Sequence, residues 1–150
     1  MSASGRGTAA GEVVLAAAEL RVVSSRLLRH LRSARAGIEV TPSQAVVLSR
    51  LGSEGALSVA DLARAERVRP QSMRTTLAAL EERGLVSRAA HPTDQRQVLM
   101  SLTAEGRRLL RAAHDAKEDW LAEAIRTKLS PAEQDSLIAA IPLLARLVED

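Results

Sequence analysis

The chain has 150 residues, a net charge of +3 and no cysteine, so disulfides, thiolate metal sites and thiol redox switches are excluded. Its length is sufficient for one domain whose core needs no metal or disulfide. No apolar run approaches the roughly 20 residues of a membrane span. Together with the lack of cysteine, this pattern favours the reducing cytoplasm as the location.

The N-terminal part of the chain divides into two predicted segments. Residues 1–12 are small and polar, without the apolar region of a signal peptide, and are expected to form a disordered leader. The rest, residues 13–150, is expected to form a single domain. From residue 13 to about residue 35, apolar side chains recur every three or four positions, which predicts a long amphipathic helix that Gly37 ends.

Two capping signals predict the next helices. Residues 41–44 (TPSQ) form a capping box that opens a second helix, which stops near residues 52–55. Residues 58–61 (SVAD) form another capping box. They open a short third helix in which Leu62 and Ala63 are buried.

A fourth helix is predicted from Pro70 to a C-terminal stop at Gly84. Met73, Leu77 and Leu80 form its apolar core stripe. The helical periodicity then turns four side chains outward and places two on the flanks: Gln71, Thr75, Ala78 and Glu82, with Ser72 and Arg74.

The C-terminal half contains the only good strand candidates, at residues 86–88 and 98–102. A turn-rich segment, 91–95, lies between them, so the pair predicts a β-hairpin. Thr103 caps a fifth helix, and a capping box at 130–133 opens a sixth, which extends to about residue 148. Pro142 falls inside the sixth helix and is expected to kink or break it.

The order of these elements predicts the fold class. It is mainly α with a small β-hairpin wing, a winged helix-turn-helix with long N- and C-terminal dimerisation helices. A helix fits the major groove of DNA, and the helix before it fixes its angle of entry. The polar first turns of the fourth helix are therefore candidates for contact with base edges and phosphates.

Four segments give this pattern a specific resemblance. Residues 68–73 and 80–86 resemble the recognition helix of MarR-family transcription regulators. Residues 91–98 resemble the wing of these proteins, and residues 101–106 resemble the start of the helix that follows it. The similarity covers about residues 13–148, and its most specific part is the wing.

The resemblance implies a homodimer that binds a pseudo-palindromic operator in double-stranded DNA. The family usually represses transcription, although an activator would show the same pattern. The implied DNA-binding lobe is at about 41–102, with dimerisation helices at about 13–36 and 103–148.

In the family's wing, an arginine at the tip enters the minor groove and an aspartate holds the shape of the wing. The matching residues are Arg96 and Asp94. A narrow minor groove concentrates negative potential and attracts arginine. His91 stands where aspartate is usual and Gln95 where a second arginine is frequent, so this wing carries fewer cations. The residues expected to contact DNA are Pro70, Gln71, Ser72, Arg74, Thr75, Arg88 and Arg96.

The resemblance also implies an effector, because MarR-like regulators often respond to small aromatic or phenolic anions. Candidate effector-binding residues are Arg26 and His30 on the first helix and His114 and Trp120 on the fifth. Phe and Tyr are absent, so a mostly aliphatic pocket for a small phenolic or apolar compound is expected. The three histidines are scattered without the spacing of metal ligands, and neither a metal nor a cofactor is expected.

Two other classes remain as alternatives. A helical dimerisation module that does not bind DNA would show no basic bias on the fourth helix and no arginine at the hairpin. An enzyme would need a serine or threonine partnered with a base, or a glycine-rich phosphate loop, and neither is visible. We therefore expect a transcription regulator and not an enzyme.

Overall fold

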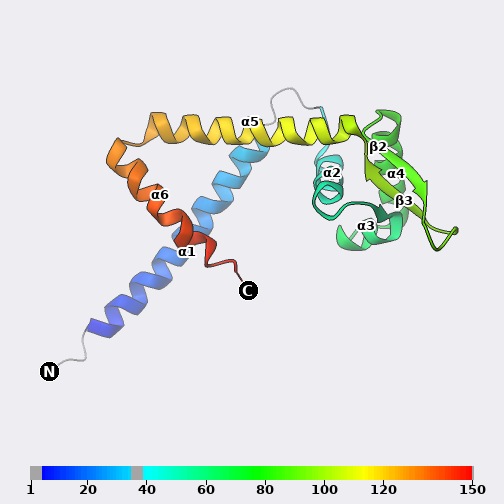
Figure 1. Cartoon of the computed structure of the whole chain (residues 1–150). Helices are drawn as coiled ribbons and strands as arrows, with labels where there is room; N and C mark the ends of the chain where they lie inside the picture. Colours follow the sequence, from blue (N-terminus) through cyan, green and yellow to red (C-terminus); the bar gives the residue numbers. More distant parts are fainter. Residues whose placement is uncertain (1–4, 35–38, 150) are drawn as a thin grey trace. The chain divides into compact units, whose positions relative to one another are not determined.

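A computed structural model describes residues 5–34 and 39–149, and the chain divides into two compact units. One unit comprises residues 37–115 and is called the winged unit below. The other comprises residues 1–36 and 116–150 and is called the terminal-helix unit. The labels in Figure 1 follow the order of the elements along the chain.

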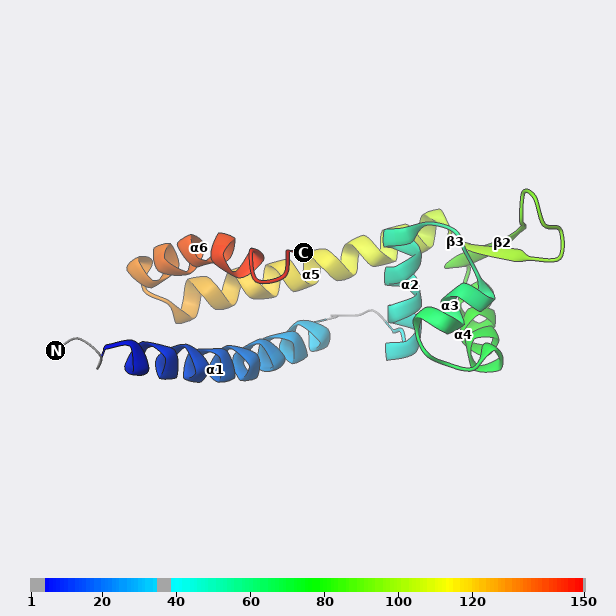
Figure 2. The same cartoon turned by 90° about the horizontal axis from the view of Figure 1, so that it is seen from below.

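The winged unit contains three helices, a small sheet and the first part of a long helix. The sheet has three antiparallel strands in the order β1-β3-β2. Figures 1 and 2 show the loop between β2 and β3 projecting away from the helices of this unit. The elements are α2 (Pro42–Glu54), β1 (Leu57–Ser58), α3 (Val59–Ala65), α4 (Pro70–Glu82), β2 (Val86–Ala90), β3 (Val98–Leu102) and the start of α5 (Ala104–Lys128).

The predicted mainly helical fold with a hairpin wing is confirmed, but strand β1 was missed. Leu57 of β1 pairs with Met100 of β3, and Ser58 pairs with Leu99. A strand of two residues shows no alternation of polar and apolar side chains. It forms because β3, some 40 residues later in the chain, offers a free edge with unsatisfied backbone groups.

The capping signals account for where the helices begin. Thr41 accepts a hydrogen bond from the Gln44 N–H at 3.2 Å, and the Gln44 side chain accepts one from the Thr41 N–H at 3.0 Å. At α3 only half of the predicted box is present. Ser58 Oγ accepts from the Asp61 N–H at 3.1 Å and donates to the Asp61 carboxylate at 2.7 Å. Aspartate is one methylene shorter than the glutamate or glutamine of a full box.

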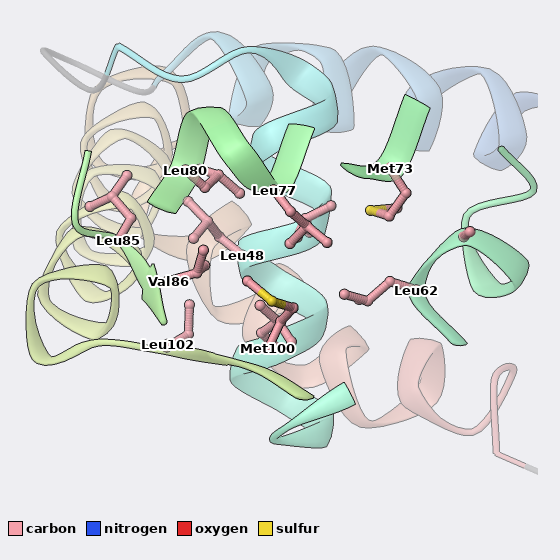
Figure 3. Packing of buried hydrophobic residues seen from close by; sticks show 12 residues of the cluster. Leu48, Leu62, Met73, Leu77, Leu80, Leu85, Val86, Met100 and Leu102 are labelled. Atoms are coloured by element: carbon pink, nitrogen blue, oxygen red, sulfur yellow. The ribbon is translucent and has the colours of Figure 1, made fainter. Parts of the chain in front are cut away.

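The core of the winged unit joins α2, α3, α4 and the sheet. Leu62 of α3 and Leu80 of α4 have no exposed surface. Figure 3 shows Leu48 of α2 lying among the side chains of α4 and of strands β2 and β3. Full burial of such a side chain stabilises the fold by about 1.5–3 kcal/mol. The predicted core stripe of α4 is confirmed and holds the helix by its inner face: Met73, Leu77 and Leu80.

The terminal-helix unit contains α1 (Gly5–Ser33), the second part of α5 and α6 (Pro131–Ala145). Helix α1 begins at Gly5, so residues 5–12 are helical and the predicted disordered leader is wrong for them. Ala9 and Ala10 are strong helix formers that contribute no apolar period. Residues 1–4 of that leader, and the predicted helix end at residues 35–37, lie outside the described residues.

The break expected at Pro142 does not occur in helix α6. The helix continues through Pro142 and ends one turn later, at Ala145. Proline lacks an N–H group, so α6 lacks one backbone hydrogen bond there. Beyond it, the Leu147 N–H bonds to the Leu144 carbonyl at 3.1 Å, a tighter turn that closes the helix. In the described part of the chain, no helix combines the length and hydropathy of a membrane span.

Candidate nucleic-acid interface

The outer face of α4 is polar along its first turns. Gln71, Ser72, Arg74 and Thr75 are all exposed, and Pro70 occupies the first helical position. The Thr75 hydroxyl donates to the Gln71 carbonyl at 3.1 Å, so it can offer only its lone pairs to a ligand. Ser72 lies on the flank that faces α2. Gln71 and Arg74 therefore have the most freedom to contact a partner.

The backbone at the start of α4 is also available. Arg69 precedes the helix and makes no capping hydrogen bond with its side chain. The first turn of α4 contains no acidic residue. Free N–H groups and the helix dipole at such an end favour a negatively charged group.

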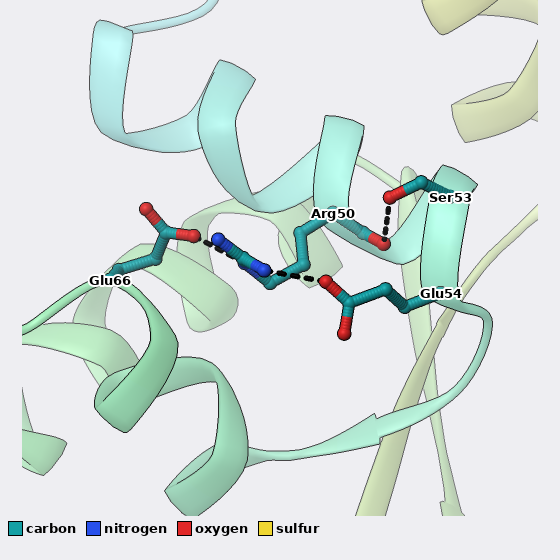
Figure 4. Close-up of polar contacts among 4 residues, drawn as sticks. All are labelled: Arg50, Ser53, Glu54 and Glu66. Carbon is teal, nitrogen blue, oxygen red and sulfur yellow. Dashed lines mark hydrogen bonds and ion pairs between the residues drawn. The ribbon is translucent and has the colours of Figure 1, made fainter. Parts of the chain in front are cut away.

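An ion-pair network fixes the turn between α3 and α4 (Figure 4). Arg50 on α2 donates through Nε to the Glu66 carboxylate and through Nη1 to Glu54 at 2.5 Å. These bonds raise the pKa of Arg50 above its ordinary value, and the bond to Glu66 is the larger cause. Arg67 follows in the left-handed conformation, with φ of 53°. This conformation turns the chain sharply toward α4.

The wing is shaped by side chains that bind backbone groups of its own loop. Asp94 Oδ1 accepts a hydrogen bond from the Arg96 backbone N–H at 3.0 Å, and Oδ2 accepts one from the side-chain Nε2 of Gln97 at 3.2 Å. His91 Nδ1 accepts from the N–H groups of Thr93 at 3.2 Å and Asp94 at 3.1 Å. His91 thus performs in this turn the acceptor role that an aspartate would have. Among the described residues, Arg96 forms no ion pair.

Unlike Arg74 and Arg96, Arg88 forms an ion pair with another described residue of the chain. Its Nε donates to the Glu81 carboxylate at 2.7 Å, and Nη2 donates to the second oxygen. This pair lowers the pKa of Glu81 and raises that of Arg88 through the same hydrogen bonds. The pair joins the end of α4 to β2. Arg88 is therefore placed to support the wing rather than to project from it.

Sequence reasoning missed two cations beside α4. Arg64 lies on the exposed side of α3, and Arg69 immediately precedes α4. The periodicity offered a signal for Arg64, because the neighbouring Leu62 and Ala63 face the core and Arg64 must then face outward. Arg69 was visible as the residue before the helix-starting proline.

The candidate effector residues divide between the two units. In the terminal-helix unit, the rings of His30 and Trp120 stack with centroids 5.6 Å apart and planes at 12°. Arg26 lies one helical turn before His30 on α1, so the two share a face. His114 belongs to the winged unit.

Comparison with known proteins identifies the family. The model of the MarR family matches residues 40–98. The HTH-type transcriptional regulator Mb0904 of Mycobacterium bovis is 42% identical over 134 residues, which cover 89% of this chain and 93% of that protein. The chain belongs to the MarR family. A second relative of this MarR protein, the HTH-type transcriptional repressor Rv2887 of Mycobacterium tuberculosis, is 36% identical over 91 residues, 61% of this chain and 66% of that protein.

Solved structures agree with the winged helix-turn-helix fold. A transcriptional regulator from Pseudomonas aeruginosa is 36% identical and has a TM-score of 0.77, covering 93% of this chain and 97% of that one. A MepR mutant of Staphylococcus aureus bound to an oligodeoxyribonucleotide has a TM-score of 0.68. It is 20% identical and covers 89% of this chain and 97% of that one, so it supports the fold alone. This MarR-family chain is a transcriptional regulator.

Proposed function

We propose that this MarR-family regulator is a homodimeric repressor that binds a pseudo-palindromic operator in double-stranded DNA through α4 and the β2–β3 wing. The observation that carries the proposal is the outer face of α4. Its first turns are exposed, polar and free of acidic residues, whereas its inner face is packed in the core. Two likenesses support the proposal, namely a relative named a repressor and a neighbour solved with an oligodeoxyribonucleotide.

In this proposal, each group makes a different contact with the operator. Gln71 reads a base edge, because a glutamine amide can form two hydrogen bonds with adenine. The N–H groups at the start of α4 donate hydrogen bonds to a phosphate. Arg96 enters the minor groove, and Asp94 holds the loop that presents it. Arg88 acts indirectly, through its bonds to Glu81.

Dimerisation is proposed from apolar side chains that the terminal-helix unit leaves exposed. In α1, Val13 is 69% exposed and Leu28 is 51% exposed. In α6, Ile138 is 63% exposed and Leu143 is 58% exposed. Large apolar side chains exposed in such number are typical of a protein interface. A two-fold dimer places its recognition helices to read half-sites about 10–10.5 base pairs apart.

The test is selection of binding sites from a random duplex library, combined with light scattering at micromolar protein. We expect a dimer and an enriched inverted repeat with the half-site spacing above. A dimer that enriches no sequence would support the alternative, a helical dimerisation module without DNA binding. A monomer at that concentration would contradict the dimer.

We also propose that a small aromatic anion binds at the His30–Trp120 stack, with Arg26 as the counter-charge. Trp120 is the only aromatic residue of the Phe, Tyr and Trp set in the chain, so its fluorescence reports on this position alone. Titration with phenolic acids should quench that fluorescence and release DNA over the same concentration range. Arg26→Ala should weaken both effects. Quenching without DNA release would refute a regulatory role.

A further inference from the structure

A groove opens between α3, together with Arg74 of α4, and the wing, wholly within the winged unit. Its volume is about 420 Å³. One wall is formed by α3 and α4 and includes Arg64 and Arg74. The other wall is the start of β3 with the loop before it, and includes Arg96 and Gln97.

The charges that line this groove are mostly positive. Three arginines, Arg64, Arg74 and Arg96, face a single carboxylate, Asp61, which leaves two positive charges uncompensated. Asp61 bonds to the Ser58 hydroxyl and lies 2.9 Å from Arg64 Nη1, and these contacts lower its pKa. Within residues 5–34 and 39–149, neither Arg74 nor Arg96 forms an ion pair. The excess positive charge of the groove therefore favours binding of an anion.

The geometry of DNA indicates which anion would bind in the groove. The major and minor grooves of a duplex are neighbours, separated by one sugar–phosphate strand. If α4 occupies the major groove and the wing occupies the adjacent minor groove, that strand must pass between them. The groove lies on that path, with α3 and Arg74 of α4 on one side and the wing on the other.

We propose that the groove seats a backbone phosphate of the strand that separates the two grooves of the operator, held by Arg64 and Arg74. Arg96 stands on the opposite wall, on the minor-groove side of the strand. This inference rests on the proposed DNA binding and deepens it. Arg74 then supplies affinity and register, whereas base selection belongs to Gln71. Phosphate contacts position a protein on DNA and carry no sequence information directly.

The first experiment compares Arg74→Ala with Gln71→Ala on the selected operator and its single-base variants, from 50 to 300 mM salt. For Arg74→Ala, we expect weaker binding to all sequences, an unchanged rank order, and a salt slope smaller by about 0.9 for the lost phosphate contact. For Gln71→Ala, we expect a changed rank order and an unchanged slope. Arg126→Ala, which removes an ion-paired arginine of the terminal-helix unit, is the control for charge.

The outcomes separate this inference from the proposed function. A changed base preference with an unchanged slope in Arg74→Ala would overturn the phosphate seat and leave DNA binding intact. A parent protein that binds no duplex would overturn the proposed function itself. Calorimetry with inorganic phosphate tests a different occupant. If Arg74→Ala abolishes phosphate binding by the free protein but leaves the salt slope on DNA unchanged, the groove is a site for a free anion and the proposal is wrong.

A second variant tests the same groove by gain of affinity. Asp61→Asn removes the one negative charge while its amide oxygen can still accept the Ser58 hydrogen bond. We expect the affinity for DNA to rise about threefold at 100 mM salt and less at 300 mM, because screening weakens the lost repulsion. Glu123→Gln is the matched control, since Glu123 and Arg126 form the same kind of pair three residues apart. An affinity that does not rise in Asp61→Asn would contradict the proposal.

Discussion

Gly106 lies against the backbone carbonyl of Leu85, so closely that a Cβ atom at position 106 would lie 2.0 Å from that oxygen. Thr103 reinforces this contact. Its N–H donates to the Leu85 carbonyl at 3.1 Å, and its hydroxyl donates to the Gly84 carbonyl at 2.6 Å. The first turn of α5 is thereby fastened to the start of β2. The base of the wing and the long helix are held together by backbone atoms.

Gly106→Ala should therefore destabilise the protein by about 1–3 kcal/mol or more, the usual range for overpacking. The atom in the way belongs to the backbone and cannot rotate aside. Gly52→Ala is the comparison, because its new methyl group would meet the tip of the Leu110 side chain, which can move. Urea unfolding monitored by circular dichroism measures both. Equal losses of unfolding free energy would show that the carbonyl contact has no special role.

The Glu81–Arg88 pair predicts a dependence of stability on pH. Arg88 lowers the pKa of Glu81 in the folded state, so the pair stabilises the fold while Glu81 is ionised. That contribution is present at neutral pH and is lost as the pH falls through the lowered pKa. Glu81→Gln should thus cost stability at pH 7 and less at pH 3. The measurement is urea unfolding of both proteins at several pH values, with the exposed neighbour Glu82→Gln as control. A cost that is the same at both pH values would refute this account.

The two carboxylates bound by Arg50 should differ in their effects. Glu66 joins α2 to the turn before α4, whereas Glu54 lies on the same helix as Arg50. Glu66→Ala should speed amide exchange at Val68, whose N–H bonds to the Ala63 carbonyl at 3.0 Å. Glu54→Ala should not change that rate. Hydrogen exchange followed by NMR measures it, and equal rates in the two variants would mean that the network does not hold the turn.

In the wing, Asp94→Ala and Asp94→Asn should have different consequences. Both remove a negative charge, but asparagine can still accept the hydrogen bond from the Arg96 N–H. Such a bond contributes about 1 kcal/mol, so Asp94→Ala should bind the operator roughly fivefold more weakly than Asp94→Asn. Fluorescence anisotropy with labelled operator measures the difference. Equal affinities would show that the charge of Asp94, and not its hydrogen bonds, matters to binding.

Local signals in the sequence predicted much of the fold. The caps at Thr41 and Ser130 and the core stripe of α4 depend on residues three or four positions apart, so the chain itself displays them. Strand β1 depends on a partner strand far along the chain, and the Glu81–Arg88 pair joins a helix to a strand. Neither was predicted. The start of α1 was missed because alanines favour a helix without marking one of its faces.

For the candidate site too, local features could be predicted from the sequence, whereas contacts between separate segments could not. The exposed positions of α4 came from periodicity alone, because burial of Met73 and Leu77 fixes which residues face outward. Arg88 was expected to contact DNA, and only the structure shows its bonds to Glu81. The groove between α3, together with Arg74 of α4, and the wing was likewise invisible, since it brings together residues from three separate segments.

Methylation protection of the operator by dimethyl sulfate is the most direct test of DNA binding by α4 and the wing. The reagent attacks guanine N7 in the major groove and adenine N3 in the minor groove, so one experiment reports on both grooves. We predict protected guanines within each half-site and protected adenines in the minor groove beside it. Arg96→Ala should restore reactivity at those adenines only. Adenines that stay protected in Arg96→Ala, or guanines that stay reactive with the parent protein, would contradict the placement of the wing and of α4.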